Sequence, residues 1–284
     1  MSVTWRGVPS PPPRRLTWGG RARAAARLAL LAPLLLVLVL AHLVGRAAER
    51  AVHGARRPWT PHLRRWGCRA ALGVIGLRRR VVGRPARGPG AQVANHAGWL
   101  DIWALASASP ATFVAKAEVR GWPVVGWVAA HAGTVFVERR RGASAVQQAA
   151  LRERLLAGDT LALFPEGTST DGRRVLPFKS TLFATFLAPG LEAARIQPVT
   201  LAYRAPEGER ADLYGWWGSM ALLPHLIEVL AVPRRGEVEI VFHEPIPVGA
   251  HPDRKALAAL CEAAVRDGLR QRVPAPAVVS AAAR

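Results

Sequence analysis

A histidine and an aspartate lie five residues apart in the stretch NHAGWLD, residues 95–101. The run AQVA before them predicts a strand, and residues 100–107 predict a helix. Positions five apart on one helix do not share a face, so a direct contact requires His96 in the loop and Asp101 in the first helical turn. Such an aspartate can accept a hydrogen bond from one imidazole nitrogen and leave the other as a base. Alternatively, both residues only cap the helix.

Two further polar clusters follow predicted strands. The stretch GTVFVERR, residues 133–140, ends with Arg139, whose guanidinium can hold a phosphate or a carboxylate. The stretch FPEGTST, residues 164–170, places Glu166 directly after an apolar strand, in a tight turn whose N–H groups can face an anion. Lys179 adds a positive charge just before another predicted helix. In isolation, the arginine cluster is also compatible with a solvated turn, and Glu166 with a turn residue that has a capping role.

Short apolar runs and helix-like stretches alternate along the chain from about residue 80. The predicted strands are residues 80–82, 91–94, 112–115, 134–137, 160–164, 196–203 and 238–242. The predicted helices are residues 100–107, 123–132, 143–157, 181–187, 222–230 and 253–270. This alternation predicts an α/β domain over residues 80–273, with a mixed, largely parallel sheet flanked by helices. Because ligands bind beyond the carboxyl ends of parallel strands, we expect the polar clusters to meet there.

Two stretches fall outside this alternation. Residues 204–218 read as an irregular insertion. Residues 274–284 have no pattern that would pack, and we expect a disordered tail.

The N-terminal third carries most of the charge. Residues 1–90 hold 18 arginines, no lysine and one acid, Glu49, for a net formal charge of +17, against +3 for the rest. The arginines flank an apolar run whose 21 residues, 24–44, would form a helix about 30 Å long, enough to cross or enter a bilayer. We therefore expect residues 1–79 to anchor the chain on a membrane. Charge on the flanks of an apolar helix argues against a nucleic-acid partner.

The sequence leaves the membrane topology open. Both flanks are basic, Pro33 permits a kink, and the apolar piece at residues 66–77 is either a returning arm or an interfacial helix. The Arg-rich lead-in disfavours a signal peptide, the other interpretation of such a run. The two cysteines, Cys68 and Cys261, match neither a disulfide framework nor a metal site, which favours a reducing compartment and a cytoplasmic catalytic domain.

Four stretches of the sequence resemble, in the same order, the four motifs of the glycerolipid acyltransferases. These stretches are NHAGWLD, GTVFVER, FPEGT and IQPVTLAY. This superfamily includes the 1-acylglycerol-3-phosphate acyltransferases, and the resemblance spans about residues 81–242. It implies that His96 is the general base and Asp101 its orienting partner. It also implies that Arg139 binds the phosphate of the acceptor. The implied acceptor site consists of Asn95, Gly133, Arg139, Glu166, Gly167, Thr168 and Lys179.

The expected reaction transfers a fatty acyl group from a thioester to the hydroxyl of a lysolipid, most directly 1-acylglycerol-3-phosphate. The donor would be acyl-CoA or acyl carrier protein, with no bound cofactor and no metal. Neither a G-x-S-x-G elbow nor a cysteine near a motif offers a nucleophile, so the expected transfer is direct. Membrane lipids are the other expected partners, and the oligomeric state is open.

One departure favours a different acceptor. Ser169 stands where many family members have an arginine after the EGT triplet. The stretch WWGSMALLPHL, residues 216–226, resembles a branch that includes lyso-ornithine lipid O-acyltransferases, whose acceptor has no glycerol phosphate. Acylation of lyso-ornithine lipid or another lysolipid is therefore the alternative.

Two other classes of protein are compatible with parts of the sequence. A hydrolase would need Ser169 or Ser180 as its nucleophile. A non-enzymatic basic membrane adaptor would explain residues 1–90 but not the three polar clusters.

Overall fold

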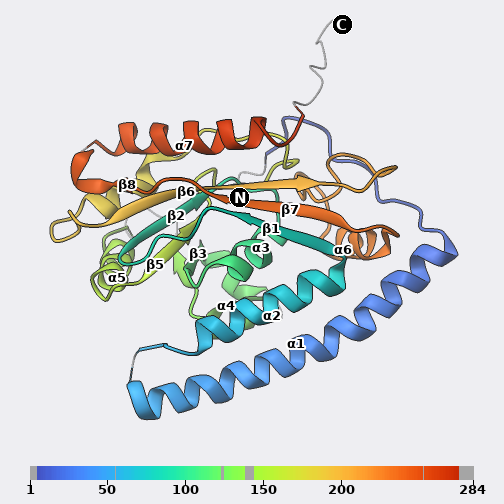
Figure 1. Cartoon of the computed structure of the whole chain (residues 1–284), viewed down its shortest axis with the longest axis horizontal. Helices are drawn as coiled ribbons and strands as arrows, with labels where there is room; N and C mark the ends of the chain where they lie inside the picture. The colour runs from blue at the N-terminus through green and yellow to red at the C-terminus, as the bar shows by residue number, and fades with distance from the viewer. Residues whose placement is uncertain (1–4, 55, 123–124, 138–143, 252, 275–284) are drawn as a thin grey trace, which may run out of the picture.

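The computed structural model describes residues 5–274 except 55, 123–124, 138–143 and 252, and it leaves the side chains of 144–148 undescribed. Within these residues one mixed sheet has the order β1-β7-β6-β2-β5-β3-β4, with β8 beside β6 (Figure 1). The strands are β1 (Leu77–Val82), β2 (Gly90–Ala94), β3 (Thr112–Lys116), β4 (Val135–Val137), β5 (Thr160–Leu163), β6 (Arg195–Arg204), β7 (Gly236–Phe242) and β8 (Ile246–Pro247).

The sheet is largely parallel, as predicted. β2 pairs in parallel with both β5 and β6, and β3 pairs in parallel with β5 and β4. β7 runs antiparallel to β6, and β1 pairs in parallel with β7. The carboxyl ends of β2, β5, β3 and β4, and of β6, therefore share one edge.

The helices pack on both faces of the sheet. They are α1 (Trp18–His53), α2 (Thr60–Ile75), α3 (Leu100–Ala108), α4 (Val125–His131), α5 (Ser144–Leu156), α6 (Leu222–Ala231) and α7 (Arg254–Arg270). The short 3₁₀ helices are η1 (Ala117–Gly121), η2 (Ser180–Leu187) and η3 (Val248–Ala250). Residues 181–187, predicted as an α-helix, thus form a 3₁₀ helix, and residues 204–218 form turns and irregular chain, as expected. α7 covers one face, while α1, α2 and α6 lie on the other (Figure 1).

Each face of the sheet has its own core. On β2, Ala91 and Val93 point to the core beneath α7 and η2, while Ala94 belongs to the core beneath α2, α3 and α6. Parallel strands buried on both faces read as continuous apolar runs, which is why the sequence located them.

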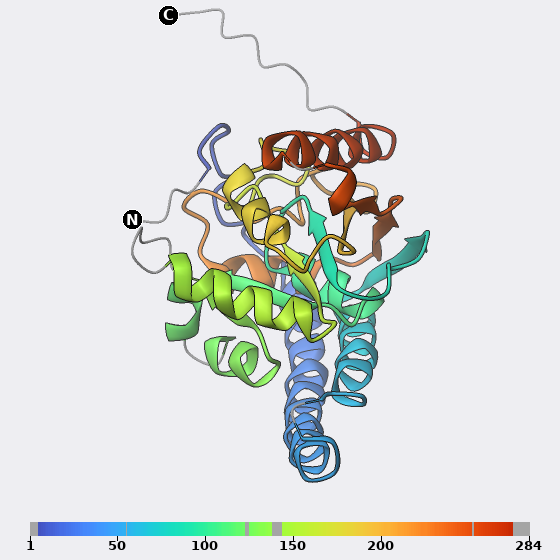
Figure 2. The same cartoon turned by 90° about the vertical axis from the view of Figure 1, so that its left-hand side faces the viewer.

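α1 is longer than the predicted helix 24–44, because the flanking Ala- and Arg-rich residues are good helix formers. It begins at Thr17, whose Oγ1 accepts a hydrogen bond from the Gly20 N–H at 3.2 Å. Arg27 donates to the carbonyls of Leu230 and Val232 at 2.9 Å, at the end of α6, where helix carbonyls lack intrahelical partners. α1 therefore packs against α2 and α6, and in Figure 2 it extends below the sheet beside α2.

A single carboxylate closes the turn between α1 and α2. Glu49 accepts hydrogen bonds from Arg46, from the Thr60 N–H and Oγ1 at 2.7 to 2.8 Å, and from the Trp59 N–H at 2.6 Å. These bonds satisfy donors at the start of α2, where helix N–H groups have no intrahelical partner. The one acid among the first 90 residues thus joins the two helices.

α2 is part of the folded domain. Its Ala71, Leu72 and Ile75 are buried in the core under the sheet. The boundary expected after residue 79 falls inside β1, because this strand pairs with β7 from Leu77 onward. The apolar periodicity did not show which residues of 66–77 face the membrane and which face the protein. The expected disordered tail lies outside the described residues except for Pro274.

Candidate active site

His96 and Asp101 are in direct contact, as their spacing predicted. His96 lies in the loop after β2, and Asp101 is in the first turn of α3. The distance from His96 Nδ1 to Asp101 Oδ2 is 2.7 Å, with the Asp101 side chain fully buried and 22% of the His96 side chain exposed. Because an ionised carboxylate only accepts hydrogen bonds, Nδ1 carries the proton and Nε2 presents a lone pair.

Asp101 is held by three further donors. Its Oδ2 accepts hydrogen bonds from the Ala97 N–H at 2.6 Å and the Gly98 N–H at 2.8 Å. Its Oδ1 accepts a hydrogen bond from the Tyr203 hydroxyl at 2.7 Å. Four donors on one buried carboxylate fix its orientation.

The imidazole and its loop are also fixed. The ring of Phe164, directly after β5, stacks on the His96 ring with centroids 4.3 Å apart. The Thr170 N–H donates to the His96 carbonyl at 2.9 Å, and the Trp216 N–H donates to the Ala97 carbonyl at 2.8 Å. In the part of the chain that the structure describes, Nε2 of His96 has no hydrogen-bond partner. A pre-oriented base with one available nitrogen is suited to remove a proton from a hydroxyl group.

Glu166 binds the backbone of the loop that carries His96. Its Oε1 accepts a hydrogen bond from the His96 N–H at 2.8 Å, and its Oε2 accepts one from the Leu176 N–H at 3.0 Å. Burial raises the pKa of Glu166 to about 8, an effect that the two N–H donors partly oppose. Both oxygens bind backbone, so this carboxyl shapes the site through the loops and not by facing a substrate.

Glu166→Gln is expected to remove a pH-dependent part of the stability. With a folded pKa of about 8, against an ordinary value of 4.5, the folded state keeps a proton that the unfolded state releases. The contribution of Glu166 to stability is therefore fully present below about pH 4.5 and is lost as the pH rises to about 8. Glutamine cannot titrate. Its amide nitrogen cannot accept one of the two backbone hydrogen bonds, so the variant should be less stable by about 1–3 kcal/mol at every pH.

Thermal melts of both proteins at about pH 5 and about pH 8 measure this difference. The Tm advantage of wild type over the variant should shrink at the higher pH. A Tm difference that is the same at both pH values would mean that Glu166 is already ionised in the folded protein.

The predicted acceptor residues divide into two groups. Thr168 and Gly167 lie in the turn after β5, and the Thr168 Oγ1 accepts a hydrogen bond from the Trp5 N–H at 3.0 Å. The exposed Lys179 is joined to this turn because its N–H donates to the Pro165 carbonyl at 3.0 Å. Asn95 bridges to β6: its Nδ2 donates to the Leu201 carbonyl at 2.9 Å, and its Oδ1 accepts from the Leu201 N–H at 2.8 Å. The amide of Asn95 thus fastens β2 to β6.

Gly133 is not brought to this cluster. It lies before the first residue of β4, towards the amino ends of the strands, whereas His96 lies beyond the carboxyl end of β2. Its φ is +87°, and a Cβ would collide with the guanidinium of Arg57. Glycine is required there for packing. Arg139 lies outside the described residues.

Sequence reasoning missed Tyr203 and Phe164. Tyr203 is near the carboxyl end of β6, and Phe164 directly follows β5. Both residues therefore lie where ligands bind in a parallel sheet, near the carboxyl ends of strands, which is the criterion that selected His96. An aromatic residue at such a position is also common in a hydrophobic core, so its type gave no signal.

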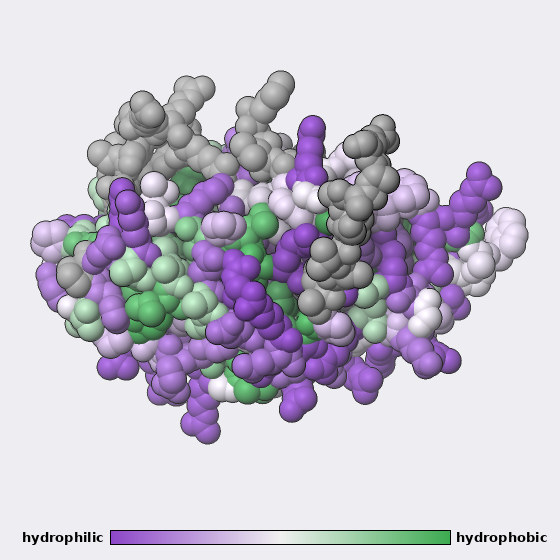
Figure 3. All heavy atoms as spheres, turned by 90° about the horizontal axis from the view of Figure 1, so that it is seen from above, coloured by the Kyte–Doolittle hydropathy of each residue, from purple (hydrophilic) through white to green (hydrophobic). Residues whose placement is uncertain are grey.

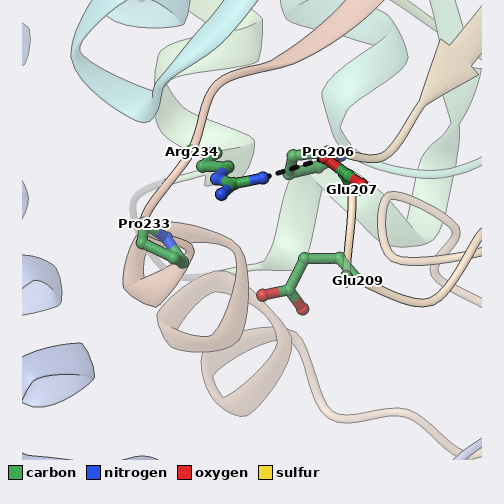
Figure 4. A pocket seen from close by; sticks show the side chains of 6 residues that line it. Pro206, Glu207, Glu209, Pro233 and Arg234 are labelled. Atoms are coloured by element: carbon green, nitrogen blue, oxygen red, sulfur yellow. Dashed lines mark hydrogen bonds and ion pairs between the residues drawn. The ribbon is translucent and has the colours of Figure 1, made fainter.

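A surface depression of about 480 Å³ lies away from these residues, between the loop after β6 and the end of α6 (Figure 4). The ion pair of Arg234 and Glu207, at 3.1 Å, crosses it. None of its lining residues belongs to the histidine cluster. No group of three or more potential metal-ligating side chains occurs within the described residues.

The class of protein follows from the comparisons with known proteins. Residues 78–202, which include His96, Asp101 and Glu166, match the family model described as Acyltransferase. The chain belongs to this family and is an acyltransferase that acts on a lysolipid acceptor.

Two kinds of relative match. The chain is 49% identical to the lyso-ornithine lipid O-acyltransferase of Rhodobacter capsulatus, over 94% of this chain and 98% of the relative. It is 40% identical to the 1-acyl-sn-glycerol-3-phosphate acyltransferase of Neisseria gonorrhoeae, over 51% of this chain and 55% of the relative. The crystal structure of the 1-acyl-sn-glycerophosphate acyltransferase PlsC from Thermotoga maritima has the same fold, with a TM-score of 0.60, 20% identity, and coverage of 88% of this chain and 97% of that one.

The same findings indicate membrane association. Among the described helices, α1 alone is long and apolar enough to cross a membrane. Only 6% of its most apolar stretch is buried in the protein, so it is not an ordinary core helix.

Proposed function

We propose that this enzyme is a lyso-ornithine lipid O-acyltransferase. The observation that carries the proposal is the likeness to the Rhodobacter capsulatus protein, which extends over nearly the full length of both chains. The likeness to the Neisseria gonorrhoeae enzyme covers about half of each chain. The relatives therefore favour the alternative acceptor over the first expectation, 1-acylglycerol-3-phosphate.

The charges near the histidine support this choice. Arg174, which follows the Glu166 turn, is paired with the buried Asp171: its Nε is 3.1 Å from both carboxylate oxygens, and its Nη2 is 2.9 Å from Oδ2. Ser169 adds no cation to the turn. A phosphate dianion favours uncompensated arginines, whereas an ornithine head group carries both an ammonium and a carboxylate. Compensation of Arg174 by Asp171 favours the second kind of head group.

In the proposed reaction His96 Nε2 removes the proton of the acceptor hydroxyl as its oxygen attacks the carbonyl carbon of the acyl thioester. Asp101 stabilises the imidazolium that forms. When the tetrahedral intermediate collapses, the C–S bond breaks and the thiolate takes the proton back from Nε2. The products are an ester and a free thiol. We propose acyl-CoA or acyl carrier protein as the donor, and no bound cofactor.

The test is an assay of the purified full-length protein with two acceptors, lyso-ornithine lipid and 1-acylglycerol-3-phosphate, and both donors. We expect lyso-ornithine lipid to have at least about tenfold higher kcat/KM, equivalent to about 1.4 kcal/mol in transition-state binding. A preference for 1-acylglycerol-3-phosphate would restore the first expectation. Release of free fatty acid in place of an acylated lipid would indicate a hydrolase.

Arg139→Lys is expected to discriminate between the acceptors. Lysine keeps the charge but cannot reproduce the bidentate geometry of a guanidinium. Loss of one charge-assisted bond, about 1.5–3 kcal/mol, corresponds to roughly a 10–150-fold drop in kcat/KM for 1-acylglycerol-3-phosphate. We expect a smaller loss for lyso-ornithine lipid and little change in the KM of the donor. The neighbouring Arg140→Lys is the control, and equal losses for both acceptors would argue against phosphate binding by Arg139.

We propose that α1 lies in the membrane surface and does not cross it. It is bonded to the domain at two separate points, through Arg27 at α6 and through His42, whose Nε2 is 3.0 Å from the His131 carbonyl at the end of α4. Its exposed side chains include Leu36 and Leu40. Exposed tryptophans on α2 and α4, on the same side of the sheet in Figure 1, suit the bilayer interface. We place the catalytic domain on the cytoplasmic side, where the acyl thioesters are made.

The double variant Leu36→Glu/Leu40→Glu is expected to weaken binding to lipid vesicles by at least about 100-fold, because each buried leucine contributes about 1.5–3 kcal/mol. The matched control is Leu260→Glu on α7. This leucine is also exposed, and its helix covers the opposite face of the sheet. Figure 3 shows that face to be covered mainly by hydrophilic residues. Vesicle sedimentation measures the difference, and equal binding by the double variant and the control would contradict the proposed surface.

A further inference from the structure

Residues 5–17 precede α1 and lie against the loops of the active site. We propose that this N-terminal segment is a clasp that positions His96, with Trp5 as its main positioning residue. The clasp joins the two loops that hold the histidine: loop A, residues 164–176, and loop B, residues 205–221. The inference rests on the proposed role of His96 as the base.

The clasp is attached to loop A through both the backbone and the ring of Trp5. The Trp5 N–H donates to Thr168 Oγ1 at 3.0 Å. The guanidinium of Arg174 lies over the Trp5 ring, 4.9 Å from its centroid, and Asp171 holds it in that position. A cation over an indole ring contributes about 0.5–1 kcal/mol at an exposed site and more when it is desolvated.

The clasp is attached to loop B at two further points. Trp217, which is 2% exposed, donates from its Nε1 to the Val8 carbonyl at 3.1 Å, and its ring lies 6.3 Å from that of Trp5. The hydroxyls of Ser10 and Ser219 are 3.1 Å apart. Trp5 therefore interacts with both loops, through Arg174 in loop A and through Trp217 in loop B.

These attachment points are next to the residues that fix the histidine. In loop A, Thr168 is two residues from Thr170, which donates to the His96 carbonyl. In loop B, Trp217 follows Trp216, which donates to the Ala97 carbonyl. The loops also touch each other, since a Cβ on Gly215 would lie 2.8 Å from the Cα of Asp171. If the clasp is removed, both loops gain freedom, and His96 moves with them.

A displacement of a catalytic group by about 1 Å can lower the rate by about 10²-fold without changing substrate binding. Trp5→Ala is therefore expected to lower kcat by about 10–100-fold and to leave the KM values within about twofold. Trp5→Phe keeps an aromatic ring beside Arg174 and Trp217 and should retain most of the activity. The control is Trp18→Ala at the start of α1, where the side chain is 84% exposed.

The experiment measures kcat and KM of full-length wild type and the three variants on vesicles that contain the acceptor. Hydrogen–deuterium exchange is measured on the same proteins. We expect Trp5→Ala to speed exchange in loops A and B and to leave α7 unchanged.

Wild-type kcat together with unchanged exchange in Trp5→Ala would overturn the proposal. So would an equal loss of kcat in Trp18→Ala, which would assign the effect to membrane binding. The exchange measurement does not depend on the acceptor. A wild type that ignores lyso-ornithine lipid would therefore reject the proposed function, and the exchange in loops A and B would still decide the clasp, because unchanged exchange in Trp5→Ala overturns it.

Discussion

His96→Ala is expected to lower kcat by about 10²–10⁴-fold, the usual contribution of a general base. The substitution removes Nε2, the nitrogen that is proposed to take the proton of the acceptor hydroxyl. It should leave the loop in place, because Glu166 and Thr170 bind the backbone N–H and carbonyl of residue 96 and not its side chain. The loss should therefore appear in kcat with a nearly unchanged Tm.

The measurement is kcat at saturating donor and acceptor, together with a thermal melt. His62→Ala on α2 is a matched control, since His62 is an exposed histidine outside the site. A well-folded His96→Ala protein within a few-fold of wild-type activity would remove His96 from the mechanism.

Asp101→Asn is expected to lower kcat by roughly 10²–10³-fold while preserving the geometry of the site. The asparagine oxygen can still accept from Nδ1 of His96 and from the N–H groups of Ala97 and Gly98. Its amide nitrogen can donate to the oxygen of Tyr203, whose hydroxyl now donates to Oδ1. What is lost is the negative charge that stabilises the imidazolium.

Tyr203→Phe is the companion variant. It removes one neutral donor but keeps the carboxylate, so we expect no more than about a tenfold loss, from about 1 kcal/mol. The kcat of both variants is compared at equal occupancy of the substrates. If Tyr203→Phe lowers kcat as much as Asp101→Asn, the role of Asp101 is to hold structure and not to supply charge.

The part of the site that the sequence predicted depends on local geometry. The contact of His96 with Asp101 follows from a strand, a short loop and a helix whose ends were visible in the sequence. The meeting of the β2 and β5 loops follows from the parallel order of the strands. These inferences need only the period of each element and the common edge of a parallel sheet.

The remaining features depend on long-range packing. The Tyr203 hydroxyl reaches Asp101 across 102 residues, and Trp5 reaches Thr168 across 163 residues. No local pattern encodes such a pair. The same limit applies to α2: its apolar residues were evident, but only the folded structure shows that Leu72 and Ile75 face the core and Trp66 faces outward. The sequence showed that Gly133 lies at the start of a strand, but it did not show that Gly133 packs against Arg57.

The docking of residues 5–17 has a consequence for how the enzyme is made. These residues and α1 leave the ribosome before loop B, and Val8 binds Trp217, which follows 209 residues later. At about 5–20 residues per second, synthesis separates the two partners by about 10–40 s. α1 can therefore meet the bilayer well before loop B exists to receive the clasp. With the clasp acting as proposed, acyl transfer begins only after loop B has been translated.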